Sequence, residues 1–119
     1  MAIQLSNEYG SVHVSDEVLA VMAGSAALEC YGLIGMATRK QLKDGIAELL
    51  GRDNLSRGVE VRQEQNGVVV DIYIIVSYGT KISEVAHNVQ NRVKYVLSHV
   101  VGLDILDVNI YVQDVRVVK

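Results

Sequence analysis

Hydrophobic residues recur with two different periods along this chain, and the period separates predicted helices from predicted strands. From Lys81 to Val101 apolar side chains return at every third or fourth position, which predicts a long amphipathic helix that ends at Gly102. From Leu106 to Gln113 apolar and polar residues alternate, which predicts a strand with one buried and one wet face.

A second pair of strands is predicted around Asn66-Gly67, which lies between the strand-like runs Arg57 to Gln65 and Val68 to Tyr78. Asn-Gly suits the positive φ angles of a tight turn, so the two runs are expected to form an antiparallel hairpin. In the second arm one side is uniformly aliphatic and is expected to be core: Val68, Val70, Ile72, Ile74 and Val76. The other side is mixed: Val69, Asp71, Tyr73, Ile75 and Ser77.

The first half of the chain is expected to contain four further elements. They are a short strand over residues 8–14, a helix from Asp16 to about Tyr31, a short buried strand over 33–37, and a second, shorter helix over 39–50. Ser15 is placed to cap the first helix. Gly32 and Gly51 are placed to end the two helices.

The order is therefore β-α-β-(α)-β-β-α-β. An arrangement in two layers buries the apolar sides of both the helices and the strands against each other. The expected fold is an α/β (α+β) two-layer sandwich, with a mainly antiparallel sheet and helices on one face. A length of 119 residues predicts a single domain over 1–119, and six tyrosines without Phe or Trp predict an aliphatic core.

A formal charge of −3 is too small to attract nucleic acid or an anionic membrane by net charge alone. A local basic region at Arg39, Lys40 and Lys43 keeps RNA binding open as an alternative, with Tyr73 or Tyr111 near Arg57 or Arg62 as stacking platforms. The acidic balance and the lack of an RNA-binding motif disfavour nucleic acid as the partner.

The compartment is predicted from cysteine usage and from the N-terminus. Cys30 is the one cysteine of the sequence, which fits a reducing cytoplasm. The N-terminus lacks the charged start and apolar stretch of a secretory signal, and no apolar run is long enough to span a bilayer.

No catalytic, cofactor-binding or metal-binding residues are predicted. Cys30 is expected at a helix C-terminus on the apolar stripe, where a thiolate is disfavoured. The three histidines lack the short spacings of a zinc site. Asp71 would be the first candidate for acid–base chemistry, but it is expected to reach solvent or the hydroxyl group of a neighbour.

The remaining polar and apolar surfaces favour an interaction or scaffolding protein, whose partners are other proteins or a second copy of the chain. The first helix has a wide apolar surface, and the last strand has a polar face. The candidate contact residues are Arg39, Lys40, Lys43, Tyr73, Asn109, Tyr111 and Gln113. A third alternative is a pocket for an acyl chain or another small molecule beneath the long helix.

Several segments resemble the alkaline shock protein family, small envelope stress-response proteins of Gram-positive bacteria. The resemblance is carried by residues 32–37 (GLIGMA) and above all by residues 70–86 (VDIYIIVSYGTKISEVA). Tyr9-Gly10, residues 15–18, residues 88–90 and residues 108–115 also fit, so it covers nearly the whole chain. The family often has Pro at the position of Ser83.

This resemblance implies a cytoplasmic, non-enzymatic protein that associates with the cell envelope through membrane-anchored relatives or by self-assembly. It implies no catalytic residues and no cofactor. The chain is most similar to short members that are often encoded beside a dihydroxyacetone-kinase-like fatty acid kinase, which implies a link to lipid metabolism.

Overall fold

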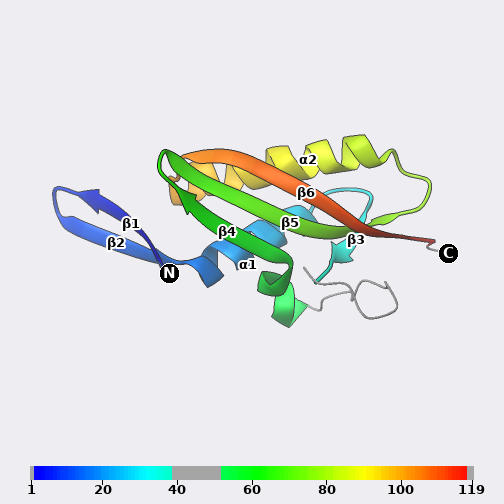
Figure 1. The fold of residues 1–119 in the computed structure, drawn as a ribbon, viewed down its shortest axis with the longest axis horizontal. Helices are drawn as coiled ribbons and strands as arrows, with labels where there is room; N and C mark the ends of the chain where they lie inside the picture. Colours follow the sequence, from blue (N-terminus) through cyan, green and yellow to red (C-terminus); the bar gives the residue numbers. More distant parts are fainter. Residues whose placement is uncertain (1, 39–51, 118–119) are drawn as a thin grey trace.

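The computed structural model describes residues 2–38 and 52–117 of the chain (Figure 1). The described elements follow the order β1 (Ala2–Asn7), β2 (Gly10–Ser15), α1 (Asp16–Leu28), β3 (Leu33–Met36), η1 (Arg52–Gly58), β4 (Val59–Glu64), β5 (Gly67–Ser77), α2 (Ile82–Tyr95), η2 (Val96–Val101) and β6 (Ile105–Arg116). η1 is a 3-10 helix, and η2 is a π-helix that continues α2. The helix expected over 39–50, with its end at Gly51, lies outside the described residues.

β5 is the central strand of a four-stranded sheet. β4 pairs antiparallel with its first half, from Glu64 opposite Gly67 to Val59 opposite Ile72, and β3 pairs antiparallel near its end. β6 runs parallel to β5 along the other edge. Parallel strands need a crossover connection, which α2 provides between β5 and β6. The expected two-layer, mostly antiparallel α+β fold is confirmed, with this one parallel pair.

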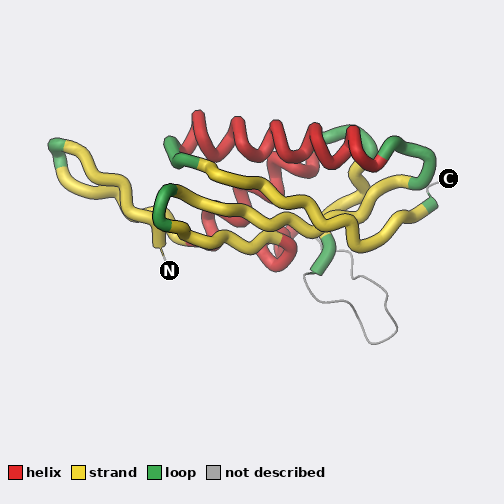
Figure 2. The backbone as a smooth tube through the Cα atoms, turned by 45° about the horizontal axis from the view of Figure 1, so that its top comes forward, coloured by secondary structure: helices red, strands yellow, loops and turns green. Residues whose placement is uncertain are grey.

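α1 and α2 cover one face of the four-stranded sheet (Figures 1 and 2). The core between the layers is aliphatic, as the composition predicts. The predicted inward side of β5 is confirmed, because its five residues are all buried: Val68, Val70, Ile72, Ile74 and Val76. α2 contributes Val85, Val89 and Val93, each at most 4% exposed.

α1 begins as predicted but ends three residues earlier than expected. The Ser15 side chain accepts a hydrogen bond from the Val18 N–H and caps the helix. The helix ends at Leu28, because the next N–H groups, those of Glu29 and Cys30, donate to carbonyls three residues back and tighten the last turn. Gly32 instead turns the chain toward β3, with φ +89°.

The first predicted strand is only partly right. β2 begins at Gly10, and it pairs with β1, which the sequence pattern did not indicate, in a separate two-stranded sheet. The turn between them forms because the Tyr9 N–H donates to Asn7 Oδ1 over 2.8 Å. This β1–β2 hairpin extends away from the rest of the molecule (Figures 1 and 2). With the hairpin included, the longest dimension of the molecule is 53 Å.

The last strand and the long helix follow the prediction with one correction. Val68 pairs with Ile105 and Val69 with Asp107, so Leu106 is an extra residue in β6 and its side chain is 42% exposed, not buried. An irregularity of this kind reverses the alternation locally. The predicted helix end is confirmed, because Gly102 has φ +91° and closes η2.

Candidate protein-interaction surface

The face of the four-stranded sheet opposite the helices is the candidate site, and we call it the open face. The strand registers place the following side chains of β4, β5 and β6 on it: Glu60, Arg62, Glu64, Val69, Asp71, Tyr73, Ile75, Ser77, Asp107, Asn109, Tyr111, Asp114 and Arg116. Three of the predicted contact residues, Tyr73, Asn109 and Tyr111, are thereby brought together. Arg39, Lys40 and Lys43 lie outside the described residues.

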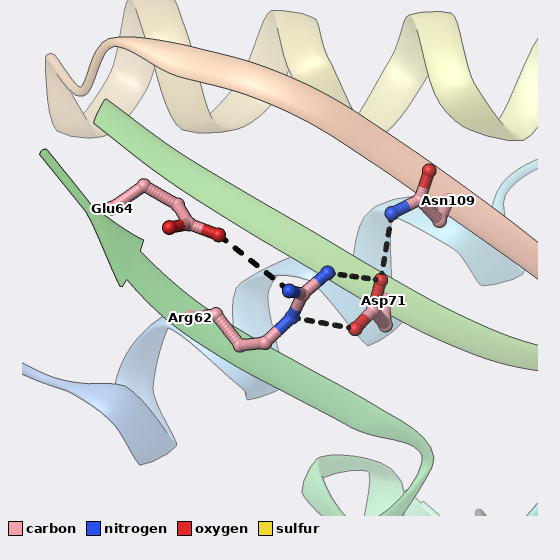
Figure 3. A network of polar contacts seen from close by, with 4 residues as sticks. All are labelled: Arg62, Glu64, Asp71 and Asn109. Carbon is pink, nitrogen blue, oxygen red and sulfur yellow. Dashed lines mark hydrogen bonds and ion pairs between the residues drawn. The ribbon is translucent and has the colours of Figure 1, made fainter. Parts of the chain in front are cut away.

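Asp71 is at the centre of a polar network on this face (Figure 3). Arg62 donates from Nε to Asp71 Oδ2 over 3.0 Å and from Nη2 to Oδ1 over 3.3 Å. Asn109 donates from Nδ2 to Asp71 Oδ1 over 2.9 Å. Glu64 adds an ion pair, with 3.6 Å between its Oε1 and Arg62 Nη1.

This network corrects the expectation that Asp71 reaches solvent or a hydroxyl group. Asp71 is 5% exposed, and both of its carboxylate oxygens are occupied by donors from neighbouring strands. A buried carboxylate needs such donors because it has lost its hydration. The hydrogen bond to Asp71, and then its negative charge, raise the pKa of the Arg62 guanidinium.

The tyrosines form the aromatic centre of the open face. Tyr73 and Tyr111 are opposite one another in the parallel register of β5 and β6, and their rings stack with centroids 4.8 Å apart and 14° between planes. Tyr111 is 43% exposed. Arg62, proposed above as a neighbour for base stacking, is already bound to Asp71 and Glu64, so the described geometry gives RNA binding no added support.

One end of the open face is apolar. Ile75 and Ala37 are fully buried there, and Ile34 and Tyr73 pack against them. Gln113 is an extra residue of β6, between the pairs that Val112 and Asp114 make with β5. Its Nε2 donates to the Thr38 carbonyl over 3.4 Å, which joins β6 to the residues that follow β3.

The other candidate reactive groups are dispersed. Cys30 is half-buried beside the core, and burial raises the pKa of its thiol, opposed by Arg92 and assisted by Glu29. His13 contacts Ser11, His87 contacts Asn91, and His99 stacks on Tyr95 with ring centroids 4.4 Å apart. Within residues 2–38 and 52–117, no three His, Cys, Asp or Glu side chains gather as metal ligands.

The acyl-chain alternative places a pocket beneath α2. The structure has a packed interface there, in which Val85, Val89 and Val93 are buried. A cavity of about 410 Å³ lies elsewhere, at the end of the sheet. Its lining is Tyr31, Gly32, Leu33, Ile34, Ser77 and Thr80.

None of the helices in the described ranges has both the length and the apolar character needed to cross a membrane.

The Arg62–Asp71 pair was missed by sequence reasoning, although a signal for it exists. A two-residue turn at Gln65 and Asn66 fixes the hairpin register, so that Arg62 lies opposite Val69 and diagonal to Asp71. Opposite charges on diagonal positions of one sheet face lie within reach of long side chains.

Comparison with known proteins shows which sequences this chain is similar to. The sequence profile of the alkaline shock protein 23 family, described as having a cell envelope-related function, matches residues 4–117. The chain is 57% identical over 117 residues to YloU of Bacillus subtilis, covering 98% of both proteins. It is 41% identical over 118 residues to Spy1614 of Streptococcus pyogenes, covering 99% of this chain and 98% of that protein. Both relatives are named as uncharacterized proteins. No solved structure matches the chain.

Proposed function

The chain belongs to the alkaline shock protein 23 family, whose function is related to the cell envelope, and from this premise we propose that it is a non-enzymatic interaction module. It acts in the cytoplasm and is held at the envelope by a protein partner that is itself anchored in the membrane. The resemblance to members encoded beside a fatty acid kinase extends the proposal to a role connected with lipid metabolism and envelope stress.

The observation that carries this proposal is the composition of the open face. Tyrosine and arginine are enriched at the centres of protein interfaces, where their large side chains supply both apolar area and hydrogen bonds. On the open face Tyr73 and Tyr111 stack on each other, and next to this pair Asp71 holds Asn109 from β6 and Arg62 from β4. Tyr111 keeps 43% of its surface accessible to a partner.

The open face is also preorganised for binding. Arg62 and Asn109 are held by Asp71, and the Tyr111 ring is held by its stack on Tyr73. Side chains that are already fixed lose little conformational entropy on association, so more of the contact free energy is available for affinity. The partner is therefore expected to bind this face without rearranging the sheet.

A photo-crosslinking amino acid at position 111, introduced into the full chain in the native bacterium, tests this proposal. The matched control carries it at Glu84, whose side chain is 72% exposed on α2. We expect position 111 to give a discrete crosslinked protein in the membrane fraction and position 84 to give none. Equal crosslinking at both positions, or none at position 111, would reject the open face as the binding surface.

A further inference from the structure

The open face carries an excess of negative charge. Strands β4, β5 and β6 place five carboxylates and two arginines on it: Glu60, Glu64, Asp71, Asp107, Asp114, Arg62 and Arg116. Both arginines already form ion pairs within the face. Arg62 pairs with Asp71 and Glu64, and Arg116 pairs with Asp114 over 3.2 Å. A partner that approaches these three strands therefore meets a negative surface.

Asp107 is an exposed carboxylate on the β6 side of this face. It lies opposite Val69 of β5, which in turn lies opposite Arg62 of β4. Neighbouring strands are about 5 Å apart, so the backbone of Arg62 is roughly 10 Å from that of Asp107. In the part of the chain that the structure describes, no Lys or Arg forms an ion pair with Asp107. Its charge is available to a cation from outside.

A cavity continues the acidic surface past Glu64. It has a volume of about 340 Å³ and lies between the β4–β5 turn and the loop that leads into β6. Glu64 and Asp104 line it and carry carboxylates, and the amide side chains of Gln63, Gln65 and Asn66 add hydrogen-bond acceptors. Neither Lys nor Arg is among the described residues that line it. The cavity therefore suits a cationic side chain.

The stacked tyrosines offer a second kind of contact to a cation, because the face of an aromatic ring attracts Lys and Arg. Tyr111 lies on the same side of β6 as Asp107, with Asn109 between them. A strand rises about 3.3 Å per residue, so Asp107 and Tyr111 are roughly 13 Å apart along β6. An extended segment with cationic side chains at alternate residues has the same spacing.

These features favour a basic protein segment over other occupants. RNA and anionic lipid headgroups carry negative charge, so this face repels them. The partner proposed above is anchored in the membrane, and cytoplasmic segments next to transmembrane helices are enriched in Lys and Arg. The charge of the face and the expected charge of such a partner are therefore complementary.

We propose that the open face binds a Lys- and Arg-bearing stretch of the anchored partner. This stretch lies extended along β6 and places cationic side chains at Asp107, at Tyr111 and in the cavity beside Glu64. The inference rests on the proposed function, because it names the chemistry of the partner at the same face. Attraction between exposed charges is screened by salt, so the affinity falls as salt rises.

A labelled twelve-residue peptide of alternating Lys and Ser tests the charge requirement in a fluorescence-anisotropy titration of the full chain at low salt. We expect Asp107→Lys to weaken binding about tenfold, since it places like charges together, and Asp107→Asn to give a smaller loss. The matched control is Glu84→Lys, which changes the net charge equally at a side chain that is 72% exposed on α2. It should change the affinity less than about twofold.

Three results of this titration would overturn the inference. They are a peptide that does not bind the wild type, equal losses for Glu84→Lys and Asp107→Lys, and equal binding of a peptide of alternating Glu and Ser. Equal losses would mean that the peptide responds to the net charge of the chain and not to the open face.

The photo-crosslink at position 111 separates this inference from the proposed function. In the native bacterium we expect Asp107→Lys to reduce the crosslinked product about tenfold or more, and Glu84→Lys to retain it. A chain without Asp107→Lys that gives no crosslink rejects the open face and this inference with it. A crosslink that Asp107→Lys leaves unchanged, or a product that is a second copy of this chain, overturns the basic partner alone.

Discussion

Arg62 and Asp71 form a two-point ion pair across β4 and β5, and the two partners differ in exposure. The Arg62 side chain is 44% exposed, whereas that of Asp71 is 7% exposed. Water can therefore replace Asp71 as a partner of Arg62, but it reaches the Asp71 carboxylate poorly. Removing one member of a buried pair costs most when the remaining charge stays buried.

The asymmetry predicts which single substitution is worse. Arg62→Met keeps an apolar side chain over Asp71 but leaves a buried carboxylate whose one remaining hydrogen-bond donor among the described residues is Asn109. Asp71→Asn leaves Arg62 to be hydrated. In thermal unfolding we expect Arg62→Met to lower the midpoint by several degrees and by more than Asp71→Asn, and the double variant to recover part of the loss.

A second arginine provides the control for this prediction. Arg92 contacts Glu29 through Nε and Nη2, but the two side chains are 44% and 58% exposed. Exposed ion pairs contribute little, so Arg92→Met should change the free energy of unfolding by less than about 1 kcal/mol. If Arg92→Met is as damaging as Arg62→Met, burial of Asp71 is not the cause.

Gly32 and Gly79 allow the cost of backbone conformation to be separated from the cost of a clash. Both have positive φ, +89° and +95°. A Cβ on Gly79 meets nothing within 4 Å, whereas one on Gly32 lies 2.7 Å from Val85 Cγ2. Urea unfolding of Gly79→Ala should show a loss of about 1–2 kcal/mol. Gly32→Ala should lose about 1–3 kcal/mol more, because it overpacks the contact with α2. Equal losses would mean that Val85 moves aside freely.

The parts of the fold that were predictable are those specified by neighbours in the sequence. The β4–β5 hairpin and the helix from Ile82 onward follow from local patterns, and both were correctly predicted, although the turn consists of Gln65 and Asn66, one residue before the predicted Asn66-Gly67. The sequence also showed which side of β5 is core, because strand alternation requires only that one face is buried. The sequence also indicated three residues of the open face as contact residues: Tyr73, Asn109 and Tyr111.

The parts that were not predictable depend on pairing between distant segments. The residues of β6 alone do not determine that this strand runs parallel to β5. The parallel direction follows from the crossover connection through α2. The extra residues Leu106 and Gln113 are likewise consequences of the β5–β6 register. β1 escaped detection because its sequence, AIQLSN, has only two large apolar residues, Ile3 and Leu5, which are too few to show a clear alternation.

The irregularity at Leu106 makes a testable contrast with Leu103. The sequence pattern predicts an inward Leu106, but the structure exposes 42% of it and buries Leu103 to 6% exposure. Leu103→Ala should therefore reduce the free energy of unfolding by about 2–5 kcal/mol, since it opens a cavity in the core. Leu106→Ala should cost less than about 1 kcal/mol. The reverse order in chemical denaturation would show that β6 pairs in the regular register.

Cys30 supplies a prediction about pH. Burial raises the pKa of its thiol, so at a given pH a smaller fraction is the reactive thiolate than in the unfolded chain. Alkylation by iodoacetamide should be slower in the folded protein than in urea and should reach its plateau at higher pH. Arg92 lowers this pKa, so Arg92→Gln should shift the folded profile further toward alkaline pH. Because access alone would slow alkylation equally at every pH, the midpoint and not the rate is the quantity to compare. An Arg92→Gln midpoint at or below that of the wild type would show that the guanidinium does not act on the thiol.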